Sequence, residues 1–377
     1  MKIKKKIVFL TGTRADFGKL RPLIEITESS DEFECHIFVT GMHTLSRYDF
    51  TYREVEKRGY KNIFVFMNET EGDNTDIILS NTIRGFSEYI RDISPDMIVI
   101  HGDRLEALAG AIVGSFNNIL VSHIEGGELT GTIDESIRHA VSKLSHIHFV
   151  SNDNAKKRLI QMGEIEERIF VIGSPDIDIM MKKDLPTKEE LTKYYDINFE
   201  KYAILIFHPV TTELEYLKNQ TTEMVAAVID SKRNYVVIYP NNDPGSDIIM
   251  KEYGKLENNQ NFKIYPSLRF EYFLTLLKNA DFIIGNSSSG ITEAEIYNIP
   301  TINLGSRQKN RTSNNNIINI ENQKDEILDA IAKVDGMEIK SSFSFGDGKS
   351  TNRFFNVISN DKIWNVSLQK QFIENGN

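Results

Sequence analysis

The chain has 377 residues, of which 54 are acidic and 44 basic, so its formal net charge is −10. Hydrophobic residues make up 40% and charged residues 26%, a composition that excludes a disordered or collagen-like protein. The acidic balance argues against a protein that neutralises many nucleic-acid phosphates, because such a protein needs a basic surface. At about 100–200 residues per domain, the length predicts two domains.

The single cysteine, Cys35, excludes an intrachain disulfide framework and a metal site built from several cysteines. After the basic start, the apolar run Ile7–Leu10 is too short for the core of a signal peptide. No apolar stretch approaches the roughly 18 residues that a membrane-spanning helix requires. We therefore expect a cytoplasmic protein that binds neither nucleic acid nor a membrane.

Short runs rich in β-branched residues alternate along the chain with amphipathic, helix-like stretches. The predicted strands of the first half are Ile7–Leu10, Cys35–Val39, Ile63–Phe66, Met97–His101, Leu120–Ile124, Ile147–Val150 and Phe170–Ile172. The predicted helices of that half are Asp76–Ile93, Leu105–Phe116 and Ile133–Leu144. The second half continues with strands Ala203–Phe207, Tyr235–Tyr239, Phe262–Tyr265, Phe282–Ile284 and Thr301–Asn303. Its clearest helices are Thr222–Ser231, Phe270–Ala280 and Lys324–Val334.

Apolar strands that alternate with helices are typical of parallel sheets covered by helices on both faces. The pattern predicts an α/β protein with two Rossmann-like domains, and the segment 174–198, with its prolines and charges, is the best boundary. We expect an N-terminal domain over residues 1–180, a C-terminal domain over 190–355, and a segment 356–377 that packs back on the N-terminal domain. Because such sheets bind ligands beyond the carboxyl ends of their strands, we expect a site in the interdomain cleft.

Polar or glycine-rich segments follow the predicted strands in both halves. They are Thr11–Asp16, Thr40–His43, His101–Arg104, His123–Glu128, His208–Pro209, Pro240–Asp243 and Gly285–Gly290. The last of these precedes a predicted helix, Ile291–Tyr297, whose free N–H groups would receive a phosphate or carboxylate. Glu293, in the first turn of that helix, would accept hydrogen bonds from ribose hydroxyls. A plain helix cap is the alternative, and the segment matches neither a Walker loop nor G-x-G-x-x-G.

Three acidic residues of the first half are candidates for the chemistry. Asp103 and Glu125 follow two strands that can be neighbours, and Asp134 opens a predicted helix. Since several acids in one cleft cannot all ionise at their ordinary pKa, we expect the pKa of at least one to be raised. The structural alternatives are a salt bridge of Asp103 with Arg104 or a cap, and, for Asp134, a cap or a pair with Arg138.

Two histidines, His146 and His148, have the spacing of residues on one face of a strand. Together with Asp103 and Glu125 they suggest a metal site, but the H-E-x-x-H pattern is missing. We therefore favour two histidines packed at a sheet face.

Several segments together resemble the UDP-N-acetylglucosamine 2-epimerase family, and more narrowly its hydrolysing branch in bacterial sialic acid synthesis. The segments are Thr11–Leu20, His101–Ala107, His123–Glu128 and Gly285–Ser288, extended by Gly173–Asp176 and Phe207–Thr212. The resemblance implies a glycosyltransferase-B type fold in which the C-terminal domain holds most of the nucleotide. It also implies a homo-oligomer and a reaction that needs neither a metal nor a redox cofactor.

The implied reaction converts UDP-N-acetylglucosamine and water to N-acetylmannosamine and UDP. The nucleotide leaves the anomeric carbon while the C2 proton is removed, and water then adds across the double bond of 2-acetamidoglucal. Carboxylates would stabilise the oxocarbenium-like transition state, and one would act as the base and then as the acid. The alternatives are GDP-N-acetylglucosamine or a UDP-linked 2,4-diacetamido sugar as substrate, a glycosyltransferase of the same fold, and a non-catalytic nucleotide-sugar sensor.

Carried over by position, the resemblance assigns catalytic roles to Asp103, Glu125 and Asp134, with Asp103 as the C2 base. The positions matched to substrate binding are Arg14, Lys19, His43, Arg104, His208, Asn241, Ser287, Ser288, Glu293 and Arg307.

Overall fold

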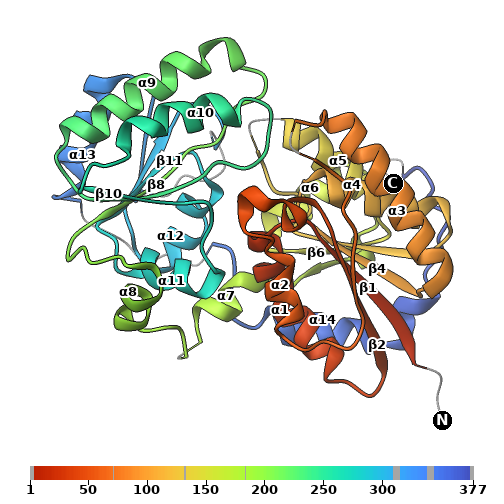
Figure 1. Cartoon of the computed structure of the whole chain (residues 1–377). Coiled ribbons are helices and arrows are strands. Elements are labelled where there is room, and N and C mark those ends of the chain that lie inside the picture. The colour runs from red at the N-terminus through yellow and green to blue at the C-terminus, as the bar shows by residue number, and fades with distance from the viewer. Residues whose placement is uncertain are drawn as a thin grey trace. The chain divides into compact units, whose positions relative to one another are not determined.

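A computed structural model describes residues 4–70, 72–130, 133–182, 184–308, 315–337 and 344–373. These residues form two compact units, each built around one sheet (Figure 1). Unit 1 comprises the described residues up to Glu128, those of Asp134–Met181, and those from Ser344 on. Unit 2 comprises the described residues of Leu129–Ile133 and Lys182–Phe343. None of the described helices is long and apolar enough to cross a membrane.

Unit 1 contains a seven-stranded parallel sheet with the strand order β3-β2-β1-β4-β5-β6-β7. Its strands are β1 (Lys5–Thr11), β2 (Phe33–Val39), β3 (Ile63–Val65), β4 (Met97–His101), β5 (Leu120–Ile124), β6 (Ile147–Val150) and β7 (Ile169–Val171). The strand order reverses between β1 and β4, and ligands of such sheets bind beyond the carboxyl ends of the strands at this point.

Helices cover both faces of this sheet. Successive residues of each strand point to opposite faces, and both sets are apolar. Ile7 and Phe9 of β1 join the apolar cluster of α1 (Arg14–Glu28) and α14 (Ser350–Ile358). Val8 and Leu10 join that of α3 (Thr75–Ile93), α4 (Leu105–Phe116) and α5 (Ile133–Leu144). The remaining helices of the unit are α2 (Tyr52–Glu56), α6 (Asp153–Gln161) and α7 (Pro175–Met180).

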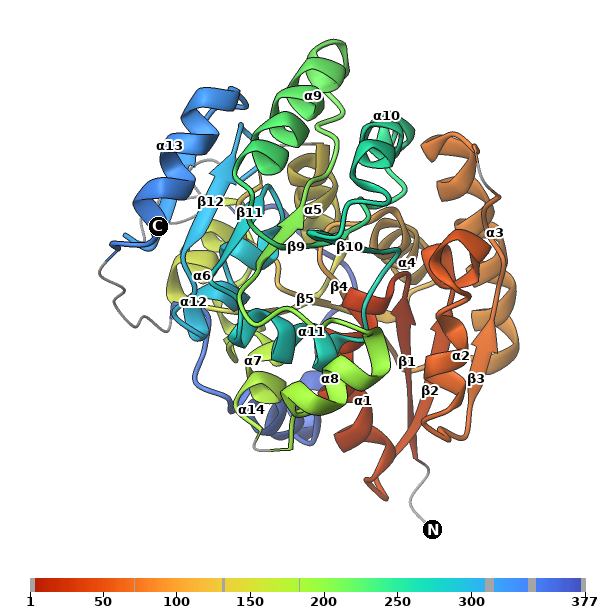
Figure 2. The same ribbon diagram turned by 60° about the vertical axis from the view of Figure 1, so that its left-hand side comes forward.

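Unit 2 contains a six-stranded parallel sheet with the order β10-β9-β8-β11-β12-β13. Its strands are β8 (Ala203–Ile206), β9 (Tyr235–Ile238), β10 (Phe262–Tyr265), β11 (Phe282–Gly285), β12 (Thr301–Leu304) and β13 (Ile317–Ile320). One face packs against α9 (Leu214–Asp230), α10 (Ser246–Tyr253) and α13 (Lys324–Val334). The opposite face carries α8 (Lys188–Tyr195), α11 (Phe270–Lys278) and α12 (Glu293–Ile296), as Figures 1 and 2 show.

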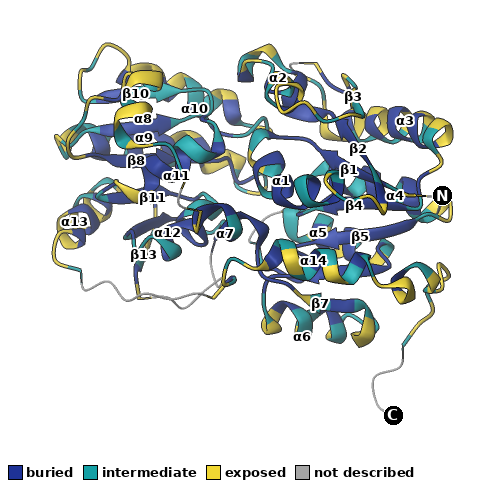
Figure 3. Cartoon of the chain, turned by 90° about the horizontal axis from the view of Figure 1, so that it is seen from below, coloured by how far each residue is buried: buried dark blue, intermediate teal, exposed yellow. Residues whose placement is uncertain are grey.

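The prediction of an α/β fold with two parallel-sheet domains is confirmed. Figure 3 shows the physical basis: the inner strands of both sheets are buried, whereas the helices expose one side to solvent. The predicted helix Ile291–Tyr297 is wrong in extent, because the structure has a 3-10 turn at Ser288–Gly290 followed by a helix of only four residues, Glu293–Ile296. The chain leaves that helix through Asn298, whose φ is 58°, before Pro300.

Candidate active site

The first group of candidate residues lies at the carboxyl ends of two adjacent strands of unit 1. Glu125 directly follows β5, and Asp103 lies in the turn after β4. The two strands pair in parallel with His101 opposite Ile124, so the expectation that Asp103 and Glu125 follow neighbouring strands is confirmed. Asp134 lies in the first turn of α5, the helix that connects β5 to β6.

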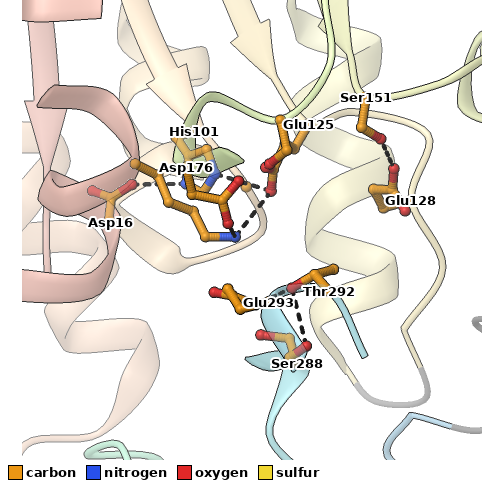
Figure 4. Close-up of polar contacts among 12 residues, drawn as sticks. Asp16, His101, Glu125, Glu128, Ser151, Asp176, Ser288, Thr292 and Glu293 are labelled. Carbon is orange, nitrogen blue, oxygen red and sulfur yellow. Dashed lines mark hydrogen bonds and ion pairs between the residues drawn. The ribbon is translucent and has the colours of Figure 1, made fainter. Parts of the chain in front are cut away.

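His101, the last residue of β4, bridges two carboxylates (Figure 4). Its Nδ1 atom lies 2.8 Å from Asp16 Oδ1 and its Nε2 atom 3.1 Å from Glu125 Oε2. Both nitrogens face acceptors, so the doubly protonated imidazolium fits this position. Burial lowers the pKa of His101, but the charges of Glu125 and Asp16 and their hydrogen bonds outweigh burial and raise it to about 9.

Glu125 is held as a carboxylate by several partners. Lys19 Nζ lies 3.6 Å from Glu125 Oε2 and 3.4 Å from Asp176 Oδ2, and the Ser174 hydroxyl donates to Glu125 Oε1. Burial raises the pKa of Glu125, but Lys19, His101 and the Ser174 hydrogen bond hold it well below its ordinary value. Glu125 is therefore not an acid with a raised pKa, because two cationic side chains flank it; the expectation that at least one acid has a raised pKa stays a prediction for the others.

The backbone of Glu125 also stands out, because its φ of 61° lies in the left-handed region that favours glycine. Backbone strain at a polar residue is typical of functional sites, where the surrounding structure holds the side chain in place. Here the Glu125 N–H donates to the Phe149 carbonyl at 2.8 Å, and its own carbonyl accepts from Arg138 Nη1 at 2.6 Å.

Arg138 connects the two candidate carboxylate residues of the strand ends. The side chain is buried, and its Nη2 donates to Asp103 Oδ2. The pKa of Arg138 is lowered by burial but raised more strongly by Asp103 and neighbouring acids, so the guanidinium is charged. Asp103 thus pairs with Arg138, while Arg104 Nε lies 3.4 Å from Glu106 Oε2.

The structure gives the other candidates of unit 1 partners within the protein. Arg14 forms an ion pair with Glu54 at 2.7 Å. His43 is buried, with Nε2 3.2 Å from Thr11 Oγ1 and Nδ1 2.7 Å from Thr51 Oγ1. Burial, with a smaller effect of Arg14, lowers the pKa of His43 to about 3, so its ring is neutral at pH 7. Contacts of Arg14 and His43 with a substrate stay predictions.

His146 and His148, the pair with metal-ligand spacing, are buried and make hydrogen bonds within the protein. His146 Nε2 donates to the Leu368 carbonyl at 3.0 Å, and His148 Nε2 lies 3.0 Å from Glu164 Oε2. These contacts agree with packing at the sheet.

In unit 2, Asn286 brings together the loops that follow three strands. Its Oδ1 accepts from the His208 N–H at 2.7 Å, and its Nδ2 donates to the His208 carbonyl at 2.9 Å. The Asn286 carbonyl accepts from Arg307 Nη1 at 3.2 Å, and His208 Nδ1 accepts from the Asn241 N–H at 3.1 Å. The predicted nucleotide-binding residues His208, Asn241 and Arg307 are thus joined around one buried amide.

Glycine is required just before this amide. The φ of Gly285 is 130°, and a Cβ there would lie 1.9 Å from the Ile206 carbonyl oxygen of the neighbouring strand. Ser287 caps the following 3-10 turn by accepting from the Ser289 N–H at 3.3 Å. The Thr292 hydroxyl lies within hydrogen-bond distance of both the Ser288 carbonyl oxygen and the Glu293 carboxylate, as Figure 4 shows, and Glu293 is buried.

Sequence reasoning missed His101, Asp176, Arg138 and Asn286 as members of these clusters. His101, Asp176 and Asn286 lie inside segments that the family resemblance already covers, namely His101–Ala107, Gly173–Asp176 and Gly285–Ser288. Arg138 had a local signal, its i,i+4 spacing from Asp134, and the charge of Asp134 does raise the pKa of Arg138; its contact with Asp103 had no signal in the sequence.

On the expectation from the family resemblance that these loops bind UDP, Asn286→Ala should weaken the binding of UDP about tenfold, because two buried hydrogen bonds of roughly 0.5–1.5 kcal/mol each are lost. Isothermal titration with UDP measures the effect, and Asn219→Ala, an exposed position on α9, is the matched control. Equal affinity of Asn286→Ala and the unchanged protein would show that this amide does not organise a nucleotide site.

Comparison with known proteins identifies the family. The profile of the UDP-N-acetylglucosamine 2-epimerase family matches residues 25–359. The UDP-N-acetylglucosamine 2-epimerase of Neisseria meningitidis serogroup B is 48% identical over 374 residues, which cover 98% of this chain and 99% of that protein. The chain belongs to the UDP-N-acetylglucosamine 2-epimerase family.

Further members of the family differ in the functions named for them. The UDP-N,N'-diacetylbacillosamine 2-epimerase (hydrolyzing) of Legionella pneumophila is 34% identical over 97% of this chain and 98% of its own length. The polysialic acid biosynthesis protein P7 of Escherichia coli is 32% identical over 99% of this chain and 95% of its own length.

A solved structure of this epimerase family has the same fold. The UDP-GlcNAc 2-epimerase of Methanocaldococcus jannaschii, in complex with UDP-GlcNAc and UDP, superimposes with a TM-score of 0.80 at 23% identity. The match covers 94% of this chain and 99% of that chain.

Proposed function

We propose that the protein is a hydrolysing UDP-N-acetylglucosamine 2-epimerase that releases N-acetylmannosamine and UDP as the first step of sialic acid synthesis. The observation that carries this proposal is the state and place of Glu125. Lys19 and His101 hold its carboxylate ionised, and it follows β5, the strand that pairs with β4, which precedes Asp103. The proposed substrate is supported by the name of the Neisseria relative. The proposed hydrolysis is supported by the name of the Legionella relative, and the proposed pathway by the name of the Escherichia coli relative.

The chemistry of the substrate explains why fixed carboxylates are needed. A proton at C2 beside an amide nitrogen is barely acidic, so cleavage of the bond from C1 to the diphosphate oxygen must lead. The electron pair leaves with UDP, and positive charge develops at C1 and the ring oxygen. A carboxylate that is already ionised and fixed, as Glu125 is, stabilises this charge without rearrangement.

Proton transfer falls to the other two acids. Asp103 removes the C2 proton, giving 2-acetamidoglucal, and water then adds its oxygen to C1. Inversion at C2 requires the new proton to arrive on the opposite face of the ring, so the acid and the base must be different groups, which revises the expectation that one carboxylate serves as both. We assign the return of the proton to Asp134, because Glu125 is held in its charged form by His101 and Lys19.

Under this proposal unit 1 performs the sugar chemistry and unit 2 binds the nucleotide. The buried Asn286 joins His208, Asn241 and Arg307, and the loop Ser287–Ser288 offers N–H and hydroxyl donors. We also propose that the enzyme works in the cytoplasm as a homo-oligomer. Light scattering tests the assembly, and a monomeric mass in the active enzyme would contradict it.

Incubation with UDP-N-acetylglucosamine in D2O, followed by proton NMR, tests the reaction. We expect free N-acetylmannosamine that carries deuterium at C2, together with UDP, because the C2 proton is exchanged with solvent during turnover. Accumulation of the UDP-linked epimer without release of UDP would make the protein a non-hydrolysing epimerase. Product with protium at C2 would contradict removal of that proton.

A second candidate substrate is UDP-N,N'-diacetylbacillosamine, favoured by the Legionella relative that is named for it. The ratio of kcat/KM for the two UDP-sugars separates the candidates. We expect UDP-N-acetylglucosamine to be preferred, since the relative named for that substrate is 48% identical to this chain and the relative named for the diacetylbacillosamine is 34% identical.

A further inference from the structure

The C-terminal strap, defined as residues 366–373, lies on unit 1 and is attached by polar contacts. The Ser367 carbonyl accepts from Arg168 Nη1 at 3.1 Å, and the Leu368 carbonyl accepts from His146 Nε2 at 3.0 Å. The other nitrogen of His146 accepts from the Val121 N–H of β5 at 3.0 Å, which fixes the neutral tautomer of the ring. The strap is therefore joined to the strand that ends beside Glu125.

Lys370 is the charged anchor of the strap. Its Nζ donates to the Ser145 carbonyl at 2.7 Å, to the Ser142 carbonyl at 3.2 Å and to Glu164 Oε2. Ser142 belongs to the last turn of α5, and Ser145 follows the helix. A helix ends with carbonyls that have no partner in the helix and with partial negative charge, so a lysine here stabilises the C-terminus of α5.

Glu164 compensates the charge of Lys370 inside the protein. The Glu164 side chain is only 3% exposed, and it also contacts Lys143 Nζ at 2.8 Å and His148 Nε2 at 3.0 Å. Burial raises its pKa, but His148, Lys370 and Lys143 lower it to about 2, so the carboxylate is charged at pH 7. A surface ion pair would hold the strap weakly, whereas a desolvated pair with further hydrogen bonds leaves a buried charge when broken.

Ser142 continues the connection toward Asp103. The Ser142 hydroxyl lies 3.1 Å from His123 Nδ1, and His123 Nε2 lies 2.8 Å from the Gly102 carbonyl oxygen. A carbonyl only accepts, so Nε2 carries the proton and Nδ1 accepts from the serine. Burial lowers the pKa of His123 to about 3, which keeps the ring neutral and this direction fixed. Gly102, with a φ of 73°, immediately precedes Asp103.

The same helix contacts the site at a second point. Arg138, one turn before Ser142, donates to Asp103 and to the Glu125 carbonyl. A shift of α5 along its axis would displace Arg138 and the Ser142–His123–Gly102 chain together. The end of α5 that Lys370 holds is thus connected twice to the residues around Asp103.

We propose that Lys370 is a positioning residue: by holding the C-terminus of α5, the C-terminal strap sets the location of Asp103 through His123 and Arg138. The effect on turnover rests on the proposed function, whereas the effect on the backbone around Gly102 does not. Lys370 lies outside the candidate site, so it acts on proton transfer only through these contacts.

The test compares full-length Lys370→Met with the unchanged protein. Methionine keeps an unbranched stem of four heavy atoms and removes the charged nitrogen with its donors. We expect kcat for the UDP-sugar to fall about tenfold with KM changed less than twofold, and hydrogen exchange to rise in peptides covering residues 101–104 and 136–145. Exchange in β8 and β11 of unit 2 should stay the same, which excludes general unfolding. Lys362→Met, an exposed lysine in the same terminal region, is the control.

Two outcomes contradict the proposal. One is faster exchange confined to the strap with unchanged kcat; the other is faster exchange throughout both units. Faster exchange at residues 101–104 in a protein that does not turn over the UDP-sugar at all supports the positioning and contradicts the proposed function alone. If Lys370→Met does not fold, Ser142→Ala removes the hydroxyl link but leaves the carbonyl for Lys370. That variant should lower kcat and raise hydrogen exchange at residues 101–104 without freeing the strap. Unchanged exchange at residues 101–104 would contradict the proposed connection through Ser142, His123 and Gly102.

Discussion

Asp103→Asn is expected to lower kcat by about 10²–10⁴-fold, the usual contribution of a positioned general base. An amide keeps the shape of the side chain and an oxygen that accepts from Arg138, but it does not take a proton. UDP binds through unit 2 in our proposal, so its affinity should change less than about threefold, a free-energy difference below 1 kcal/mol. Initial rates and isothermal titration with UDP separate the two effects.

Asp92→Asn, an exposed position on α3, is the control for Asp103→Asn. A melting temperature close to that of the unchanged protein shows that the buried Arg138 tolerates the neutral partner. Normal turnover by folded Asp103→Asn would mean that another group removes the C2 proton.

His101→Gln is expected to lower kcat about a hundredfold and to change how stability depends on pH. The pKa of His101 in the folded protein, about 9, lies above the ordinary value of 6.5. Between these pH values the folded protein holds a proton that the unfolded chain has lost. The stabilisation is therefore complete below pH 6.5 and is lost as the pH rises through 9.

Denaturant unfolding at several pH values measures this contribution. In the unchanged protein, the loss of this proton as the pH rises lowers the free energy of unfolding by up to about 1.4 kcal/mol per pH unit within this window. His101→Gln should lack that slope, whereas His139→Gln, at an exposed histidine of α5, should keep it. The same slope in both variants would place the titration elsewhere and contradict a charged His101.

The architecture could be predicted from the sequence because buried parallel strands are continuous apolar runs. Met97–His101, Leu120–Ile124 and Ile147–Val150 were predicted with the bounds that the structure shows. Strand β13, Ile317–Ile320, was missed because it is a half-exposed edge strand without a strong apolar run. Helix α8 was missed because its apolar side is small, with Leu191 the buried residue of the helix.

The candidate site was predicted less completely, because partners across strands depend on the fold. The neighbouring positions of Asp103 and Glu125 followed from the expected parallel order. The sequence indicated a cap or a pair with Arg138 for Asp134, but it gave no sign that Arg138 also pairs with Asp103 on a different element. The bridging role of His101 likewise depends on Asp16, which arrives from the helix after β1.

The cluster around Glu125 has a consequence for the energetics of the proposed reaction. It combines three carboxylate side chains, Asp16, Glu125 and Asp176, with two cationic ones, Lys19 and His101, so its formal charge is negative. Electrostatic preorganisation of this kind is built during folding, at the expense of holding like charges together. A positive centre that forms nearby then meets an attractive potential already in place, and little reorganisation energy adds to the barrier.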